Sequence, residues 1–215
     1  KYVERSFLNL KKTLRHFLNW MKMMKKLMDF NSISNEAIEI KVITERYLEE
    51  YAESIMDKEF IRKNRINIPN GITKEKLIDR LKMYLNSQKA LITLNEKRYI
   101  ICDCKTQEFI GGITVFIIDE HTLELGYWII KKFRGNGYGY SALSLMSDTI
   151  LHNLKNVDRL KLSIFNDNIE SQGLAIKCGY RLCKEENNIL EYWKYSDKVG
   201  EIHEKEGKWE SYRYR

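Results

Sequence analysis

The feature that most constrains the fold is a glycine-rich stretch, Arg134-Gly135-Asn136-Gly137-Tyr138-Gly139. It follows an apolar, strand-like run over 123–130 and precedes a segment over 140–152 that is typical of a helix. A strand, a glycine turn and a helix in that order present successive backbone N–H groups at a helix N-terminus, which suits a phosphate group. The three glycines permit positive φ angles and let a ligand approach closely. The stretch therefore predicts an anion-binding turn with a positive charge, Arg134, at its mouth.

Composition and charge narrow the class of protein. The chain has 215 residues, 43% of them apolar and 12% aromatic, enough to fill the core of one domain plus an appendage. Residues 1–37 hold eight Lys or Arg against three Asp or Glu, whereas the rest carries only a small part of the net charge of +7. A body so close to neutral is not typical of a general nucleic-acid surface, so no specific nucleic-acid partner is expected. No apolar run is long enough to predict a spanning helix.

The four cysteines bear on compartment and on metal binding. They form no C-x-x-C pair, and no histidine is spaced to complete a zinc site, so we expect no metal. We interpret them as reduced thiols of a cytoplasmic protein. One of them, Cys178, stands directly before the glycine that is expected to end a helix, where a thiol is more often buried and inert than an acyl carrier. The cysteines are Cys102, Cys104, Cys178 and Cys183.

The chain divides into three parts by pattern. Apolar residues from Val3 to Met28 recur in steps of four and three, which predicts a basic amphipathic helix over about 2–29. This helix would pack on its own domain or pair with a second copy to give a homodimer. The alternative is peripheral contact with a membrane surface or with ribosomal RNA. Three parts are expected. The N-terminal part, 1–37, contains the helix and a polar linker at 31–35. The main domain covers 38–195, and a polar tail covers 196–215.

The main domain has the pattern of a mixed α/β sheet. Its apolar runs are joined by short polar connections, which favour antiparallel pairing of the strands. Thr44 and Thr73 are candidate helix caps, and Asn187-Asn188 predicts the turn of a closing hairpin. The helices between 45 and 87 would form one wall of an acceptor cleft. The expected strands are 38–43, 90–94, 98–103, 109–118, 123–130, 159–165, 180–185 and 189–195, and the expected helices are 45–56, a short one within 57–68, 73–87, 140–152 and 168–177.

Three motifs in the correct order make this domain resemble the GNAT superfamily of N-acetyltransferases, and within it the branch of ribosomal-protein N-acetyltransferases. Arg134-x-x-Gly137-x-Gly139 is similar to the family's acetyl-CoA pyrophosphate motif, Q/R-x-x-G-x-G/A. The run Glu124-Leu125-Gly126-Tyr127-Trp128 resembles the E-[IL]-G-Y-W strand of that branch. The third match is Asn168-x-x-Ser171-x-x-x-Ala175-x-x-x-Gly179-Tyr180, similar to N-x-x-S-x-x-x-A-x-x-x-G-[FY].

The resemblance implies a GNAT acyl-CoA N-acyltransferase fold, of the α+β type with a mixed sheet, to which the N-terminal helix is added. Strand 123–130 would splay from strand 160–165 and expose backbone groups that hold the pantetheine arm of acetyl-CoA. The glycine turn would hold the pyrophosphate, and Asn168 and Ser171 would face the reactive end of acetyl-CoA. The residues expected to bind acetyl-CoA are Trp128, Ile129, Ile130, Arg134, Gly135, Asn136, Gly137, Tyr138, Gly139 and Asn168.

Acetyl transfer needs a neutral amine, a polarised thioester carbonyl and a proton for the leaving thiolate. Glu124 is the candidate base, acting through a water molecule; the alternative is a structural or substrate-holding carboxylate. A backbone N–H near Ile129 would polarise the carbonyl. Many members of the superfamily have a tyrosine acid where this chain has Ala175, so Ser171 becomes the candidate acid, against the alternative of a cap or a cofactor contact.

These observations predict an acetyl-CoA-dependent N-acetyltransferase whose acceptor is a protein or peptide α-amine. One alternative is a small-molecule acetyltransferase that acts on a polyamine or an aminoglycoside-like amine. A polyamine acceptor is disfavoured by Ala175 in place of tyrosine and by the absence of marked acidity in the main domain. The others are a CoA-binding regulatory domain without catalysis and an assembly protein in which the N-terminal helix is the functional element.

Overall fold

The structure is a computed structural model, and it describes residues 30–64, 72–89 and 95–197, with six single positions between 14 and 26. Most of the helix expected over 2–29, the strand expected over 90–94 and nearly all of the tail expected over 196–215 lie outside these residues. No helix in the described part is both long and apolar enough to cross a lipid bilayer.

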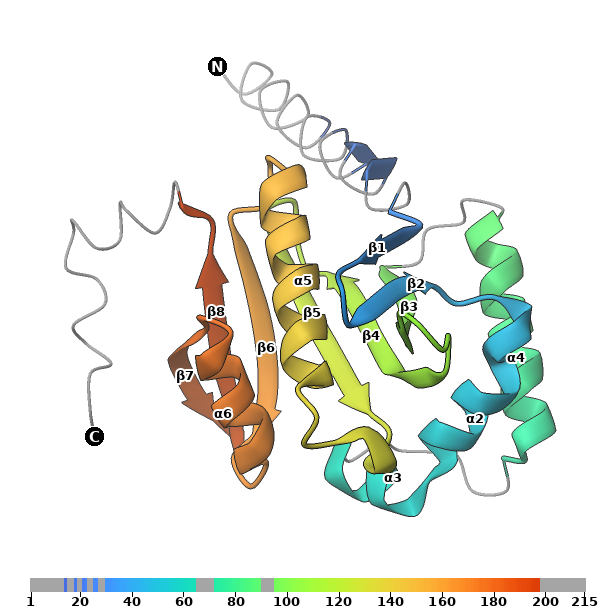
Figure 1. The fold of residues 1–215 in the computed structure, drawn as a ribbon. Coiled ribbons are helices and arrows are strands. Elements are labelled where there is room, and N and C mark those ends of the chain that lie inside the picture. Colours follow the sequence, from blue (N-terminus) through green and yellow to red (C-terminus); the bar gives the residue numbers. More distant parts are fainter. Residues whose placement is uncertain are drawn as a thin grey trace.

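The strands of the described residues form one mixed sheet of eight (Figure 1). Its order is β1-β2-β3-β4-β5-β6-β8-β7, and every pairing is antiparallel except that of β5 with β6. The short polar connections thus predicted antiparallel pairing correctly. The strands are β1 (Ser32–Ser34), β2 (Ile38–Val42), β3 (Glu96–Asp103), β4 (Phe109–Ile117), β5 (Thr122–Ile129), β6 (Arg159–Phe165), β7 (Arg181–Glu186) and β8 (Ile189–Tyr195).

Helices cover the two faces of this sheet unequally. On one face α5 and α6 pack against a large core, and Figure 1 shows them crossing in front of β5, β6 and β8. On the other face α2 and α4 pack over β3 and β4 around a smaller core that includes Trp128. The helical segments are η1 (Glu45–Tyr47), α2 (Leu48–Met56), α3 (Lys58–Asn64), α4 (Lys74–Lys89), η2 (Lys131–Phe133), α5 (Tyr138–Asn153) and α6 (Ile169–Lys177).

Local signals placed most of these elements correctly. Thr73 caps α4, since its hydroxyl oxygen accepts a hydrogen bond from the N–H of Lys76 at 3.3 Å. Asn168 caps α6 through a hydrogen bond from the N–H of Ser171. Asn187 and Asn188 both have positive φ angles, as the turn of a tight hairpin requires.

Two local expectations are wrong. The stretch 31–35, expected to be a linker, contains strand β1, in which Ile33 pairs with Ile40 of β2 and packs on the core. A strand of three residues with one apolar side chain is too short to show an alternating pattern. Thr44 makes no side-chain cap, because the chain enters α2 through the 3₁₀ turn η1 instead.

The close pairing of β4 with β5 depends on a glycine. A Cβ atom on Gly111 would lie 2.2 Å from the carbonyl oxygen of Trp128, a contact that backbone atoms cannot relieve without moving the strands apart. Gly112 lies beneath the Trp128 ring in the same way. The register of β5, and with it the position of Trp128, is therefore set by two small residues on β4.

We expect Gly111→Ala to lower the free energy of unfolding by about 1–3 kcal/mol, because the added methyl group overpacks the β4–β5 pair. Gly173→Ala is the matched control: a Cβ atom at this position inside α6 would have nothing within 4 Å. There alanine should raise stability by about 0.5–1 kcal/mol through its higher helix propensity. Urea unfolding of the three proteins measures both effects. Equal stability of Gly111→Ala and the original protein would contradict the tight contact.

Candidate active site

The site begins where two parallel strands separate. β5 and β6 pair only from Thr122–Glu124 to Arg159–Lys161. Beyond Glu124, β5 continues with β4 as its strand partner on one edge. The N–H of Ile130 donates to the carbonyl of Ile110 on that edge at 2.9 Å, so by alternation the N–H of Ile129 points toward the other edge, where β6 has turned away. This is the splay that the family resemblance implied.

The glycine turn follows β5 and starts helix α5. Gly135 and Gly137 have φ angles of 80° and 81°, in the left-handed region that favours glycine. Gly137 is the N-cap of α5, and no side chain caps the helix. The first N–H groups of a helix of 16 residues are therefore left for another acceptor. The space above both glycines is open, since a Cβ atom on either would have nothing within 4 Å. This geometry fits a phosphate group at the helix N-terminus.

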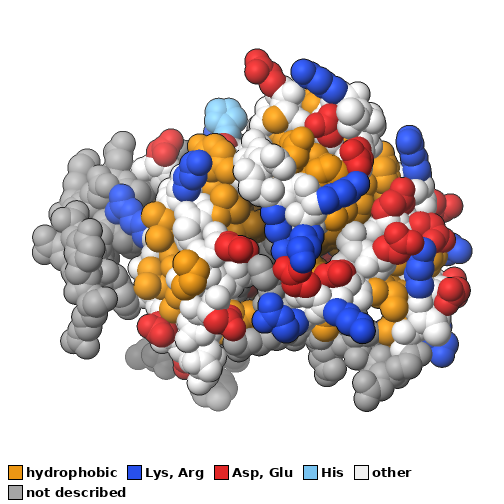
Figure 2. All heavy atoms as spheres, turned by 60° about the horizontal axis from the view of Figure 1, so that its bottom comes forward, with side chains coloured by type: hydrophobic (Ala, Val, Ile, Leu, Met, Phe, Trp, Pro, Cys, Tyr) orange, Lys and Arg blue, Asp and Glu red, His pale blue; other side chains and the backbone are white. Residues whose placement is uncertain are grey.

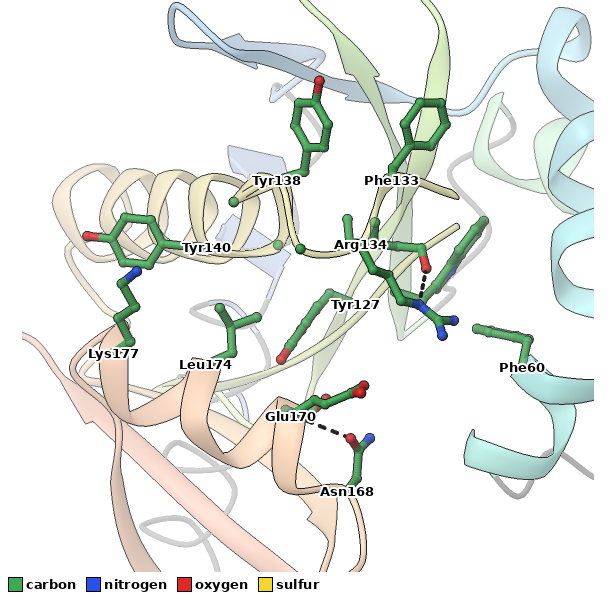
Figure 3. Close-up of a pocket in the computed structure, with 16 residues that line it drawn as sticks. Phe60, Tyr127, Phe133, Arg134, Tyr138, Tyr140, Asn168, Glu170, Leu174 and Lys177 are labelled. Atoms are coloured by element: carbon green, nitrogen blue, oxygen red, sulfur yellow. Dashed lines mark hydrogen bonds between the residues drawn. The ribbon is translucent and has the colours of Figure 1, made fainter. Parts of the chain in front are cut away.

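A cavity of about 430 Å³ opens between β5, the glycine turn and α6 (Figure 3). Lys177 and Tyr140 lie at one end of it, with the Lys177 Nζ 4.8 Å from the centre of the Tyr140 ring. Phe60 of α3 and the guanidinium group of Arg134 lie at the other end. The lining residues are Phe60, Tyr127, Trp128, Ile129, Phe133, Arg134, Gly135, Gly137, Tyr138, Gly139, Tyr140, Asn168, Glu170, Ser171, Leu174 and Lys177.

The Arg134 side chain is held by protein groups in this structure. Its Nη1 lies 2.8 Å from Oε1 of Glu59, and its Nε donates to the carbonyl of Ile129 at 3.0 Å. Lys131 contacts the same carboxylate at 3.0 Å. Hydrogen bonds from Lys131 and Arg134 lower the pKa of Glu59 to about 2, so the carboxylate is ionised at neutral pH. These contacts tie α3 to the start of the glycine turn.

The cavity brings together most of the predicted site residues. Nine of them line it: Trp128, Ile129, Arg134, Gly135, Gly137, Tyr138, Gly139, Asn168 and Ser171. Two other predicted residues, Asn136 and Ile130, do not line the cavity and make hydrogen bonds within the turn and the sheet instead. Asn136 donates from its side chain to the carbonyls of Phe133 and Arg134 at 3.3 Å, and the N–H of Ile130 is used in the β4 ladder.

Glu124 lies away from this cavity. It stands at the last paired position of β5, and its carboxylate is 3.0 Å from the Nζ of Lys161 on β6. The same ammonium lies 3.9 Å from Glu191 on β8. Alternation places Glu124 on the face of β5 that also carries Gly126 and Trp128, opposite to the face that packs on α5. Glu124 thus lies where β5 and β6 begin to separate. Its side chain is on the face of the sheet opposite to α5 and the glycine turn.

Some lining residues were not predicted. Glu170, Leu174 and Lys177 follow one another at steps of four and three along α6, so the helical period could have placed them on the face of Ser171. Phe60 carries no such signal, because it reaches the cavity from α3, far away in the sequence. Tyr127 and Tyr140 also line the cavity, although they were not among the residues expected to bind acetyl-CoA.

A second cavity, of about 580 Å³, adjoins the first. The two share Phe60, Trp128, Ile129 and Arg134, which form the wall between them. Charged groups of both signs line the second cavity: Arg46, Glu50, Glu53, Asp57, Glu108, Lys131, Lys132 and Arg134. Figure 2 shows acidic and basic side chains intermixed around hydrophobic ones on this side of the molecule.

Comparison with known proteins identifies the family. A family model described as an acetyltransferase (GNAT) domain matches residues 38–181. The chain belongs to the GNAT family and is an acetyl-CoA-dependent N-acetyltransferase. No curated protein matches its sequence.

Solved structures show the same fold at low identity. RimL, a ribosomal α-N-protein acetyltransferase in complex with coenzyme A, is 16% identical, with a TM-score of 0.63 over 77% of this chain and 98% of that one. A ribosomal-protein alanine acetyltransferase from Vibrio fischeri is 16% identical, with a TM-score of 0.62 over 77% and 97%. A spermidine N-acetyltransferase SpeG chimera from Vibrio cholerae and hSSAT is 15% identical, with a TM-score of 0.59 over 75% and 96%.

We expect the glycine turn to bind the pyrophosphate of acetyl-CoA. A negatively charged substitution at Gly137 tests this expectation. Gly137→Asp and Gly137→Asn impose similar backbone strain, since both residues tolerate a left-handed conformation. Only aspartate places a negative charge at the helix N-terminus, so acetyl-CoA should bind it about tenfold or more weakly than the asparagine variant. Calorimetric titration, with the thermal shift on binding as a second measure, gives the two affinities. Equal affinities would remove the turn as the pyrophosphate site.

Proposed function

We propose that this enzyme transfers the acetyl group directly from acetyl-CoA to the α-amine at the N-terminus of a protein or peptide. The observation that carries this proposal is the position of the second cavity, which meets the first at Phe60, Trp128 and Arg134. An acceptor lying in the second cavity would present its amine at the wall that faces the donor. Direct transfer requires that the amine and the thioester meet there.

The charges around the second cavity favour a peptide over a polyamine. The four acidic side chains of its lining are matched by four basic ones, so the cavity can attract one ammonium group but has no excess of negative charge to hold a ligand that carries only positive charges. A peptide N-terminus has one ammonium group followed by neutral amides and side chains of either sign. Proteins of this fold include acetyltransferases named for ribosomal proteins and one named for spermidine, so the fold itself does not decide between the two acceptors.

The chain's own residues supply the groups that the transfer needs. Acetyl-CoA supplies the activated acyl group, and the residues that would hold it are the glycine turn, the β5 edge, Asn168 and Ser171. The N–H of Ile129 would donate to the thioester carbonyl oxygen. Glu124 would accept the amine proton through a chain of water molecules along the face of β5 that it shares with Trp128, and Ser171 would supply a proton or a hydrogen bond to the departing sulfur.

The acceptor class is tested by competition between matched substrates. We expect a short peptide with a free N-terminus to be acetylated with kcat/KM at least about tenfold above that for spermidine, because the lining of the second cavity has no excess of negative charge to hold several ammonium groups. The same peptide with a blocked N-terminus and an internal lysine is the control, and it should not react. Mass spectrometry locates the acetyl group, and thiol release gives the rates. A higher kcat/KM for spermidine would overturn the peptide assignment in favour of the small-molecule one.

We expect Glu124→Gln to lower kcat by about 100-fold, the usual effect of removing a general base. Glu191→Gln is the comparison, because Glu191 is the other carboxylate that faces Lys161. Loss of activity only in Glu191→Gln would move the base to that residue. Full activity in both variants would leave the two carboxylates with a structural role.

A further inference from the structure

The described positions of the N-terminal segment present apolar side chains to solvent. All six of these positions, between 14 and 26, are helical and exposed. Three of them are apolar: Leu14, Leu18 and Met21 have exposed fractions of 57%, 48% and 48%. They follow one another at steps of four and three, so they lie on one face of a helix. A helix packed on its own domain through this face would bury all three, and the structure does not bury them.

The other three described positions are lysines that border this apolar face. They are Lys22, Lys25 and Lys26, and all are exposed. Lys22 comes four residues after Leu18, and Lys25 comes four residues after Met21, so their side chains lie beside the apolar ones. In the sequence, residues 5–28 contain seven Lys or Arg and no Asp or Glu. A partner for this segment has to accept apolar side chains and positive charge together.

The charge of the segment argues against a second copy of the chain as that partner. Paired helices are commonly stabilised by opposite charges on either side of their apolar seam. Neither a parallel nor an antiparallel pairing of 5–28 brings a carboxylate to the lysines, because this stretch contains none. Like charges at helical spacing destabilise such a pair. Self-association would therefore bury the apolar face only by bringing like charges together.

An anionic lipid surface accepts both kinds of side chain. Its headgroups attract lysine, and the boundary between headgroups and acyl chains takes up the apolar face of an amphipathic helix. The long lysine side chains can keep their ammonium groups at the headgroups while their methylene stems lie in this boundary. RNA also offers negative charge, but its bases are recognised mainly by stacking and hydrogen bonding. Leucine and methionine side chains supply neither, so RNA would leave the apolar face in water.

We propose that the N-terminal segment binds in the plane of an anionic lipid bilayer. The apolar face of Leu14, Leu18 and Met21 enters the boundary between headgroups and acyl chains, and the three lysines lie among the headgroups. This contact holds the acetyltransferase domain at a membrane surface. The inference concerns where the enzyme acts, and it does not depend on which amine the enzyme acetylates.

The test is cosedimentation of the 215-residue chain with vesicles made of equal parts of phosphatidylcholine and phosphatidylglycerol. Binding to vesicles of phosphatidylcholine alone should be at least about tenfold weaker. Replacement of Lys22, Lys25 and Lys26 by glutamine should weaken binding to the mixed vesicles about 100-fold, since each charge contributes about fivefold. The double variant Leu14→Gln, Leu18→Gln keeps the charge, and it should bind about tenfold or more weakly because its apolar face is interrupted.

Two control variants change the main domain in the same way. Replacement of Lys82, Lys105 and Lys184 by glutamine removes the same charge from exposed positions of the domain. Met83→Gln removes an apolar side chain of α4 that is 71% exposed. Both controls should bind the mixed vesicles as the original protein does. The thermal shift produced by acetyl-CoA should be the same in all variants, which shows that the domain is folded in each.

Three results would overturn the proposal. The first is no binding to the mixed vesicles, or equal loss of binding in the lysine variant of the main domain. The second is a dimer in sedimentation velocity that Leu14→Gln, Leu18→Gln dissociates, without vesicle binding, which would assign the face to a second copy. The third is tighter binding to single-stranded RNA than to vesicles, with no effect of the leucine substitutions, which would assign the lysines to RNA.

Discussion

The whole site depends on the short parallel contact between β5 and β6. Three residue pairs hold the strands together, and then β6 turns away while β5 stays paired with β4. This separation leaves one edge of β5 with backbone groups that face a cavity instead of a strand. Buried backbone groups need partners, so such an edge is stable only next to water or a ligand. A ligand with amide groups of its own, such as the pantetheine arm, can take the place of the missing strand.

The electrostatics of the donor cavity follow from how Arg134 is held. Arg134 begins the glycine turn, yet its guanidinium group binds Glu59 and the Ile129 carbonyl. The low pKa of Glu59 keeps this pair intact at neutral pH. The anion-binding capacity of the turn therefore rests on the uncapped N-terminus of α5, and the arginine serves to fasten α3 against the turn. That fastening also positions Phe60, which separates the two cavities.

How much of this was predictable from the sequence depends on how far apart the contributing residues are. The glycine turn, the Asn168 cap and the Asn187-Asn188 hairpin are contiguous signals, and the structure contains all three. The strand β1 and the Glu59–Arg134 pair join segments whose local pattern says nothing of their partners. Glu124 is an example of a residue that was only partly predictable. Its face of the strand followed from alternation, but its contact with Lys161 depends on which strand lies beside β5.

The same distinction explains why the donor of the reaction is easier to identify than the acceptor. Acetyl-CoA is the same in every family member and is met largely by backbone geometry, which a short glycine motif can encode. The second cavity is lined by side chains from separate segments, among them η1, α2, α3, the turn before β4 and η2, and no single backbone motif forms it. In the function that we propose, the charges on these separate segments select the acceptor, and Glu50, Asp57, Lys131 and Lys132 are the positions at which specificity is expected to be set.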